Sequence, residues 1–191
     1  MPAHTLRLLF ATTVLSLVAG CATLPTDTPQ DEAHSTGASA DSTDDRQAEW
    51  PNERAMLKQQ LADLPGITLQ AREDGALLLR LPAADGFARN SADPVDSLRA
   101  MLDRVAEVLV PLEHTQIKVL GHTDSMGNEL YNLQLSIRRA ETVMDYLRSR
   151  GIALTRLSAD GRGEAEPIAN NREETGRAIN RRVELIVRPQ E

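Results

Sequence analysis

The feature that most restricts how this chain folds is a long apolar stripe in its second half. The stripe consists of Leu133, Ile137, Ala140, Met144 and Leu147, whose separations alternate between four and three residues. This spacing predicts one amphipathic helix, and Gly151 is suited to its C-terminal cap. A helix with a single apolar side must bury that side against a sheet or another helix, so the neighbouring segments have to supply a core.

Strand and helix patterns alternate around this helix. Two strand-like runs, at 67–71 and 76–81, are separated by Glu73-Asp74-Gly75, where the Asp-Gly pair supplies the positive dihedral angles of a tight hairpin turn. Apolar residues recur at helical spacing over 98–109. The remaining segments are strand-like runs at 116–120, 156–160 and 183–187 and a turn-rich loop at 161–171. This order predicts an α+β fold, a single domain at 67–191 in which two main helices pack on one face of one mixed β-sheet.

A shorter helical pattern precedes the domain, at 47–66. It starts near Trp50-Pro51, where proline suits the first turn of a helix, and it ends at Pro65-Gly66. We expect a short amphipathic helix at the edge of the domain. Its tryptophan, the only one in the chain, has two readings: it packs against its own domain, or it contacts a protein partner.

Residues 1–20 resemble a secretion signal. One basic residue, Arg7, precedes an apolar run that is too short to span a bilayer permanently. The run ends in Val18-Ala19-Gly20-Cys21, which resembles a bacterial lipobox, and Cys21 is the only cysteine in the chain. The resemblance implies cleavage before Cys21 and lipidation of its thiol, whereas the alternative is an ordinary signal peptide with a stray thiol. Ala22, which is not aspartate, favours an outer-membrane lipid anchor with the domain facing the periplasm.

Residues 21–46 predict a flexible linker behind the lipidated N-terminus. They are rich in Thr, Pro, Asp, Ser and Gly, so they cannot bury enough apolar surface to offset the entropy of ordering. Such a linker averages about 25 to 30 Å end to end, which lets the tethered domain search the space between membrane and cell wall. Residues 1–20 contain one of the 21 basic residues and none of the 28 acidic ones, so the mature chain is acidic. This balance argues against nucleic acid and anionic lipid headgroups as partners.

The segment from Gly121 to Ala140 contains the residues best suited to bind a ligand. Asp124 lies at the end of a predicted strand, just ahead of a helix. A carboxylate in this position can have a purely structural role, as a helix cap or as a loop residue. On that helix Asn132, Ser136 and Arg139 share a face at the rim of the apolar stripe. A carboxylate and a guanidinium at opposite poles suit a zwitterion that resembles an amino acid. A plain salt bridge between the two side chains remains an equal alternative on these residues alone.

The motifs in this half of the chain resemble the OmpA C-terminal-like peptidoglycan-binding domain, which peptidoglycan-associated lipoproteins and flagellar stator anchors share. The motifs are, in order, GHTDSMG, YNLQLSIRRAETVMDYL, GI, GRGEAEPIANN and GRAINRRVEL, within about 67–187. The resemblance implies that Asp124 and Arg139 bind the free end of the meso-diaminopimelate side chain in the peptide stem.

The resemblance also implies roles for further residues. Asn132 and Leu135 would line the pocket, and Arg181 would face the ligand while its neighbour Arg182 pairs with acidic groups of the fold. The chain departs from the family in the loop at 86–91, which lacks the usual Phe-Asp segment. Asn90 in this loop is a further candidate contact.

Other site chemistries fit the sequence less well. His122, Asp124 and Ser125 are too close together to converge as a catalytic triad, so we do not expect an enzyme. No residues supply the third and fourth ligands of a metal, no cofactor motif is present, and Gly161-Arg162-Gly163 reads as a turn rather than a phosphate loop. The arginines at 172–188 are interleaved with glutamates, which argues against nucleic acid.

The predicted function is therefore an outer-membrane lipoprotein that binds peptidoglycan non-covalently and links the membrane to the cell wall. The alternative is a regulatory or assembly lipoprotein that uses the same domain to position an envelope protein partner, contacted through the helix at 47–66.

Overall fold

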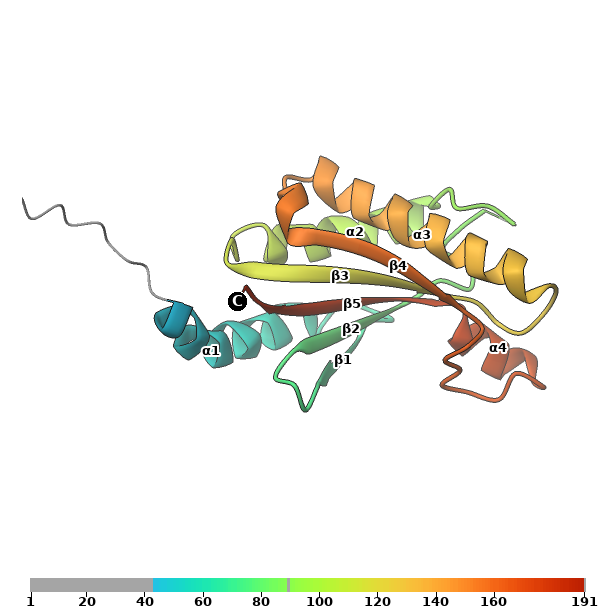
Figure 1. Cartoon of the computed structure of the whole chain (residues 1–191), viewed down its shortest axis with the longest axis horizontal. Helices are drawn as coiled ribbons and strands as arrows, with labels where there is room; N and C mark the ends of the chain where they lie inside the picture. The colour runs from blue at the N-terminus through green and yellow to red at the C-terminus, as the bar shows by residue number, and fades with distance from the viewer. Residues whose placement is uncertain (1–42, 89, 191) are drawn as a thin grey trace, which may run out of the picture. The chain divides into compact units, whose positions relative to one another are not determined.

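The computed structural model describes residues 43–88 and 90–190, with side chains from residue 49 onward (Figure 1). The predicted signal peptide, the lipidation site Cys21 and the linker as far as residue 42 lie outside this range. The elements are α1 (Thr43–Leu61), β1 (Thr68–Ala71), β2 (Leu77–Pro82), α2 (Asp96–Leu109), β3 (Thr115–His122), α3 (Glu129–Ser149), the 3-10 turn η1 (Leu154–Arg156), β4 (Leu157–Gly163), α4 (Glu174–Asn180) and β5 (Arg182–Pro189). The described residues all belong to one compact unit.

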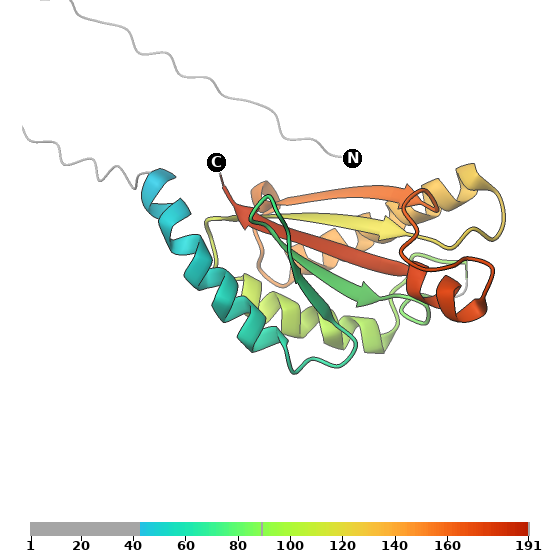
Figure 2. The same ribbon diagram turned by 90° about the horizontal axis from the view of Figure 1, so that it is seen from below.

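The strands form one five-stranded sheet in the order β1-β2-β5-β3-β4 (Figure 2). β3 and β4 are parallel, and the chain crosses between them through α3, as a parallel pair requires. The pairs β1-β2, β2-β5 and β3-β5 are antiparallel. The predicted α+β class and the mixed sheet are confirmed.

The core lies between the sheet and the helices α2 and α3, which cover the same face (Figure 1). Alternation along the strands turns every second side chain toward this core. The core-facing residues of the two central antiparallel strands are Leu77, Leu79 and Leu81 in β2 and Val183, Leu185 and Val187 in β5, all essentially buried. From the helices, the fully buried side chains include Leu102, Leu109, Val143 and Leu147.

The buried face of α3 is rotated from the predicted stripe. Leu133 is 38% exposed, whereas Asn132, Ser136 and Arg139 are buried along with Val143 and Leu147. The three polar residues were predicted at the rim of the core, and this placement is wrong. They lie on the side of α3 that faces the sheet. The N-terminal half of the helix packs there on glycines and polar loops rather than on apolar side chains of the strands.

Helix α1 begins earlier and ends earlier than predicted. It covers Thr43–Leu61 and continues through Pro51, although a proline inside a helix removes one backbone donor and crowds the preceding turn. Residues 43–46 are therefore helical and do not belong to a flexible linker. Trp50 is 5% exposed and its Nε1 donates to the carbonyl of Gly75 at 2.8 Å. Together with the fully buried Leu57 and Leu61, it is part of the domain core, which supports packing over partner contact for this tryptophan.

The C-terminal third contains two differences from the predicted order. β4 continues to Gly163, so Gly161-Arg162-Gly163 is the end of a strand rather than a turn. The short helix α4 follows the loop and was not predicted, because its seven residues contain too few apolar positions to show a helical period.

Candidate ligand-binding site

Asp124 lies in the loop that joins β3 to α3. Its Oδ1 accepts the backbone N–H of Met126 at 2.9 Å, which closes a tight turn. The helix N-terminus itself is capped by Asn128, whose side chain accepts the backbone N–H of Tyr131. Asp124 had two possible structural roles without a ligand, a helix cap and a loop carboxylate. The structure supports the loop carboxylate.

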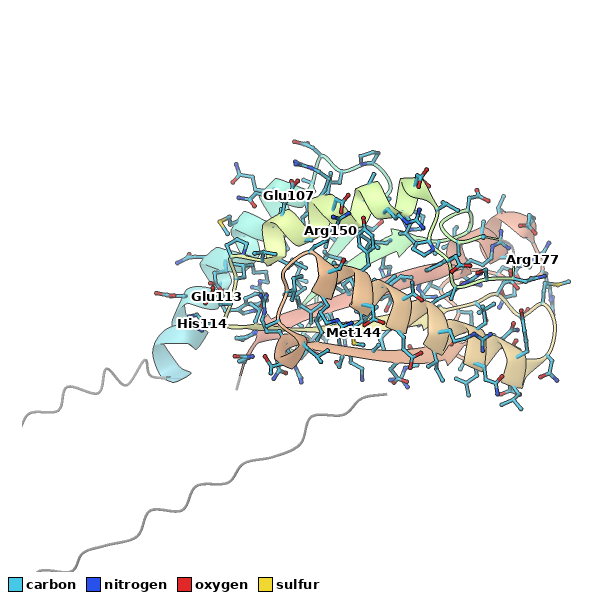
Figure 3. The ribbon with its side chains drawn as sticks, turned by 90° about the horizontal axis from the view of Figure 1, so that it is seen from above. Glu107, Glu113, His114, Met144, Arg150 and Arg177 are labelled. Atoms are coloured by element: carbon cyan, nitrogen blue, oxygen red, sulfur yellow. The ribbon has the colours of Figure 1, made fainter. Side chains whose placement is uncertain are left out.

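A chain of ion pairs extends from Asp124 to α4. Arg181 Nη1 donates to Asp124 Oδ2 at 2.7 Å, and Arg181 Nη2 donates to Glu174 Oε1 at 2.8 Å. Glu174 Oε2 in turn accepts from Arg177 Nε and Nη2. Arg177 lies at the end of the sheet far from Glu113 and His114 (Figure 3). The alternative of a salt bridge between Asp124 and Arg139 is not present among the described residues. Asp124 pairs with Arg181 instead.

Arg139 is a buried cation without a carboxylate partner. The residue is 9% exposed, its Nε donates to the carbonyl of Ser91 at 3.0 Å, and its guanidinium lies 4.8 Å from the centre of the Phe87 ring. Within residues 49–88 and 90–190, neither Nη atom makes a hydrogen bond or ion pair. Burial, together with the positive charges of Arg181 and Arg138, lowers the pKa of this guanidinium, while the negative charge of Asp124 acts to raise it. A guanidinium remains protonated under all ordinary conditions, so Arg139 presents two positively charged Nη donors that no described residue uses.

Asn132 holds the Asp124 loop in place. Its Nδ2 donates to the carbonyls of Asp124 and Met126 and to Glu164 Oε2, at 3.3, 3.1 and 2.7 Å. One buried amide thereby ties the start of α3 to the turn before it and to the loop after β4. Leu135, one turn further along α3, is 6% exposed.

Two glycines let α3 approach the sheet closely enough to form this arrangement. A Cβ at Gly121 would lie 2.1 Å from the carbonyl oxygen of Ser136, and a Cβ at Gly161 would lie 2.3 Å from Ser136 Oγ. Ser136 Oγ accepts the backbone N–H of Gly163 at 2.9 Å. The close contact sets the position of Arg139, which follows one turn later on the same helix.

The remaining predicted residues lie in different surroundings. Asn90 is exposed in the loop at 86–91 and has φ 54°, a conformation in which asparagine is common. Arg182 is buried and pairs with Glu184 at 2.8 Å, which agrees with the predicted pairing of this residue with an acidic group of the fold. Arg181 also pairs with acidic residues, Asp124 and Glu174, and its contact with a ligand stays a prediction. The sequence interpretation missed Phe87, Glu164 and Glu174. The only signal for Phe87 was its place in the loop at 86–91, which was compared with the Phe-Asp segment of the family. The two glutamates were visible only as acidic residues among the arginines, and nothing in the sequence pairs a particular glutamate with a particular arginine.

The described part of the chain shows neither a metal cluster nor a membrane span. No three or more His, Cys, Asp or Glu side chains among the described residues are placed to hold a metal ion. Among the described helices, none combines the length and apolar character that crossing a membrane requires.

Comparison with known proteins agrees with the resemblance seen in the motifs. Residues 86–181 match the OmpA family, and the chain belongs to this family. Outer membrane protein A of Bordetella avium is 46% identical over 89 residues, which cover 47% of this chain and 46% of that protein. Peptidoglycan-binding protein ArfA of Mycobacterium tuberculosis is 39% identical over 101 residues, which cover 53% of this chain and 31% of that protein. The matched segment thus spans less than half of each relative.

A solved structure has the same fold over most of the described chain. The cell wall anchor of the T6SS from Pseudomonas aeruginosa superposes with a TM-score of 0.61 and 29% sequence identity, covering 71% of this chain and 96% of that structure. The fold therefore extends beyond the segment that the family match covers.

Proposed function

We propose that this protein binds peptidoglycan non-covalently through the free end of meso-diaminopimelate, and that it links the outer membrane to the cell wall. The observation that carries the proposal is the buried guanidinium of Arg139, which has no carboxylate partner among the described residues and lies close enough to Asp124 to feel its charge. A guanidinium that has lost most of its contact with water, and whose terminal donors no described residue uses, is suited to bind an anionic ligand.

The two poles of the site match the two charges of the ligand end. Arg139 offers both Nη atoms to the ligand carboxylate in a bidentate geometry. Asp124 accepts the ligand ammonium, since each of its oxygens accepts one protein hydrogen bond and retains a second lone pair. Arg181 positions that carboxylate and joins it to Glu174.

The other predicted residues shape the site in this proposal. Asn132 holds the Asp124 loop, Leu135 provides an apolar floor, and Asn90 lies next to Ser91, whose carbonyl orients Arg139. The family relatives support wall binding, because one of them is named a peptidoglycan-binding protein and the similar structure is named a cell wall anchor. Outer membrane protein A, another relative, agrees with the outer-membrane location that the lipobox predicts.

Cosedimentation of residues 40–191 with purified sacculi tests the proposal. The wild type should pellet with sacculi that contain diaminopimelate, and Asp124→Asn and Arg139→Gln should each weaken binding by roughly 10- to 100-fold, as expected for one charged hydrogen-bonded contact. The matched controls are Asp145→Asn and Arg138→Gln, which remove the same charges from exposed positions of α3. Both controls should pellet like the wild type.

Sacculi with lysine in place of diaminopimelate separate the two parts of the proposal. Lysine lacks the terminal carboxylate, so binding should fall as far as in Arg139→Gln. Equal binding to both kinds of sacculi would refute the diaminopimelate contact and leave wall binding intact. If the folded wild type does not pellet with either kind, wall binding itself is wrong.

A further inference from the structure

A second cluster of charges lies on the face of the sheet opposite α2 and α3. Arg80 follows the core-facing Leu79 in β2, so its side chain points to the other face of the sheet. On that face it lies directly across from Glu184 of β5, its partner in the strand pairing. Arg80 Nε and Arg182 Nε both donate to Glu184 Oε1, at 3.1 and 2.8 Å. Nε2 of the buried His122 lies 3.6 Å from Glu184 Oε2. Two guanidinium groups thus share one carboxylate.

The guanidinium of Arg80 retains unused donors. Both terminal nitrogens of Arg182 donate hydrogen bonds, Nη1 to the carbonyl of Asn180 and Nη2 to the carbonyl of Glu166. The Nη atoms of Arg80, in contrast, make no hydrogen bond or ion pair with any described residue, and its side chain is 27% exposed. The cluster therefore has one more positive than negative charge, and the group that carries this excess reaches solvent.

The Arg80 guanidinium lines a small cavity whose other walls are largely apolar. The cavity has a volume of about 200 Å³, and its lining includes Thr68, Arg80, Pro82, Ile168, Ile179 and Arg182. Ile168 and Ile179 are 45% and 53% exposed, so two large apolar side chains flank the charged group without being covered by the fold. A ligand that fills this cavity would combine a carboxylate with a branched apolar body.

We propose that this cavity binds the C-terminal residue of a protein partner, with the terminal carboxylate on Arg80 and a large apolar side chain between Ile168 and Ile179. Thr68 places the cavity next to β1, an edge strand of the sheet. Arg72 donates its backbone N–H to the carbonyl of Ala76, so by antiparallel alternation Leu69 and Ala71 present their backbone groups to the open edge. An extended peptide that ends in the cavity can pair with these groups.

Nuclear magnetic resonance titration of ¹⁵N-labelled residues 40–191 tests this site with three small probes. N-acetyl-L-leucine presents the carboxylate and the apolar body, N-acetyl-L-leucinamide lacks the charge, and N-acetyl-D-alanine represents the end of a peptidoglycan stem. We expect saturable shifts of the Thr68, Ile168 and Ile179 amides with N-acetyl-L-leucine at millimolar concentration. The amide probe should bind at least roughly tenfold more weakly, because it loses a charged hydrogen bond.

Substitutions check that the shifts come from the proposed contacts. Arg80→Gln should weaken binding of N-acetyl-L-leucine by roughly tenfold, whereas Arg99→Gln, an exposed arginine of α2, should not change it. Ile179→Ser removes the apolar wall from the surface without touching the Glu184 network, so it should also weaken binding even if Arg80→Gln proves unstable. No saturable shift, equal shifts with the amide probe, or unchanged binding to Ile179→Ser would overturn the site. Preference for N-acetyl-D-alanine would overturn the protein terminus as its ligand.

Discussion

Replacing Gly121 by alanine should destabilise the domain through packing alone. Gly121 has an ordinary backbone conformation, so alanine meets no dihedral penalty there. Its new Cβ, however, would lie 2.1 Å from the carbonyl oxygen of Ser136, where ordinary contact begins at 3.4 Å. Because the obstacle is backbone and cannot rotate away, β3 and α3 have to separate by about 1 Å. Overpacking costs about 1 to 3 kcal/mol, and this rigid contact places Gly121→Ala near about 3 kcal/mol.

Unfolding of residues 40–191 by urea and by heating, each followed by circular dichroism, measures this loss. For a domain of this size, about 3 kcal/mol corresponds to a melting temperature lower by about 6 to 12 °C. Gly75→Ala is the matched control, since nothing lies within 4 Å of its Cβ but its φ is +82°. Alanine there costs only the strained backbone, about 1 kcal/mol. A Gly121→Ala variant as stable as the wild type, or less affected than Gly75→Ala, would refute the close-packing argument.

Three further substitutions test the buried polar contacts. Burial by itself raises the pKa of the Glu184 carboxyl, but the adjacent His122 ring and Arg182 guanidinium outweigh it and hold the pKa well below its usual range. The charge of Glu184 therefore stabilises the fold above the pKa of the unfolded state, about 4.3, and this stability is lost as the pH falls toward the folded pKa. Glu184→Gln should cost about 3 kcal/mol at pH 7; a loss that stays the same in urea unfolding at pH 3 would contradict the linkage. Arg156→Met should cost about 3 kcal/mol in the same assay, because it removes the buried guanidinium that donates to the carbonyls of Leu109, Val110 and Thr115, of which Leu109 also accepts the N–H of Leu112; a cost below about 0.5 kcal/mol would mean that water replaces the guanidinium. Asn180→Ala should cost about 2 to 4 kcal/mol, since this fully buried amide bonds Ile168, Ala169 and Asn171; faster proteolysis of the 164–173 loop is the second readout, and wild-type resistance would contradict the role.

Local patterns predicted most of the fold because they depend on neighbouring residues. The Asp74-Gly75 turn, the helix at 98–109 and the strand runs each have a period or turn signal within a short window. The errors fall where such a signal is weak or where another segment decides. Helix α4 is too short to show a period, and α1 passes through Pro51 because Trp50, Leu57 and Leu61 are held by the core.

The ligand site was predicted as a set of residues but not as a set of contacts. Asp124 and Arg139 were selected by their chemical types and by the family motifs, and the structure brings both to the same end of the domain. The partner of each was not predictable, because Arg181 lies 57 positions from Asp124 and Ser91 lies 48 positions from Arg139. No local periodicity links residues so far apart.

The sequence by itself determined the class of fold, the order of its main elements and the residue types available at the site, because periodicity, turn chemistry and motif spacing are properties of adjacent residues. Only the tertiary structure decided the charge pairing. Asp124 pairs with Arg181, and Arg139 has no carboxylate partner among the described residues. On the other face of the sheet, Arg80 and Arg182 both pair with Glu184. Ion pairs depend on distances across the sheet, and those distances are set by close approaches such as that of Gly121 to Ser136.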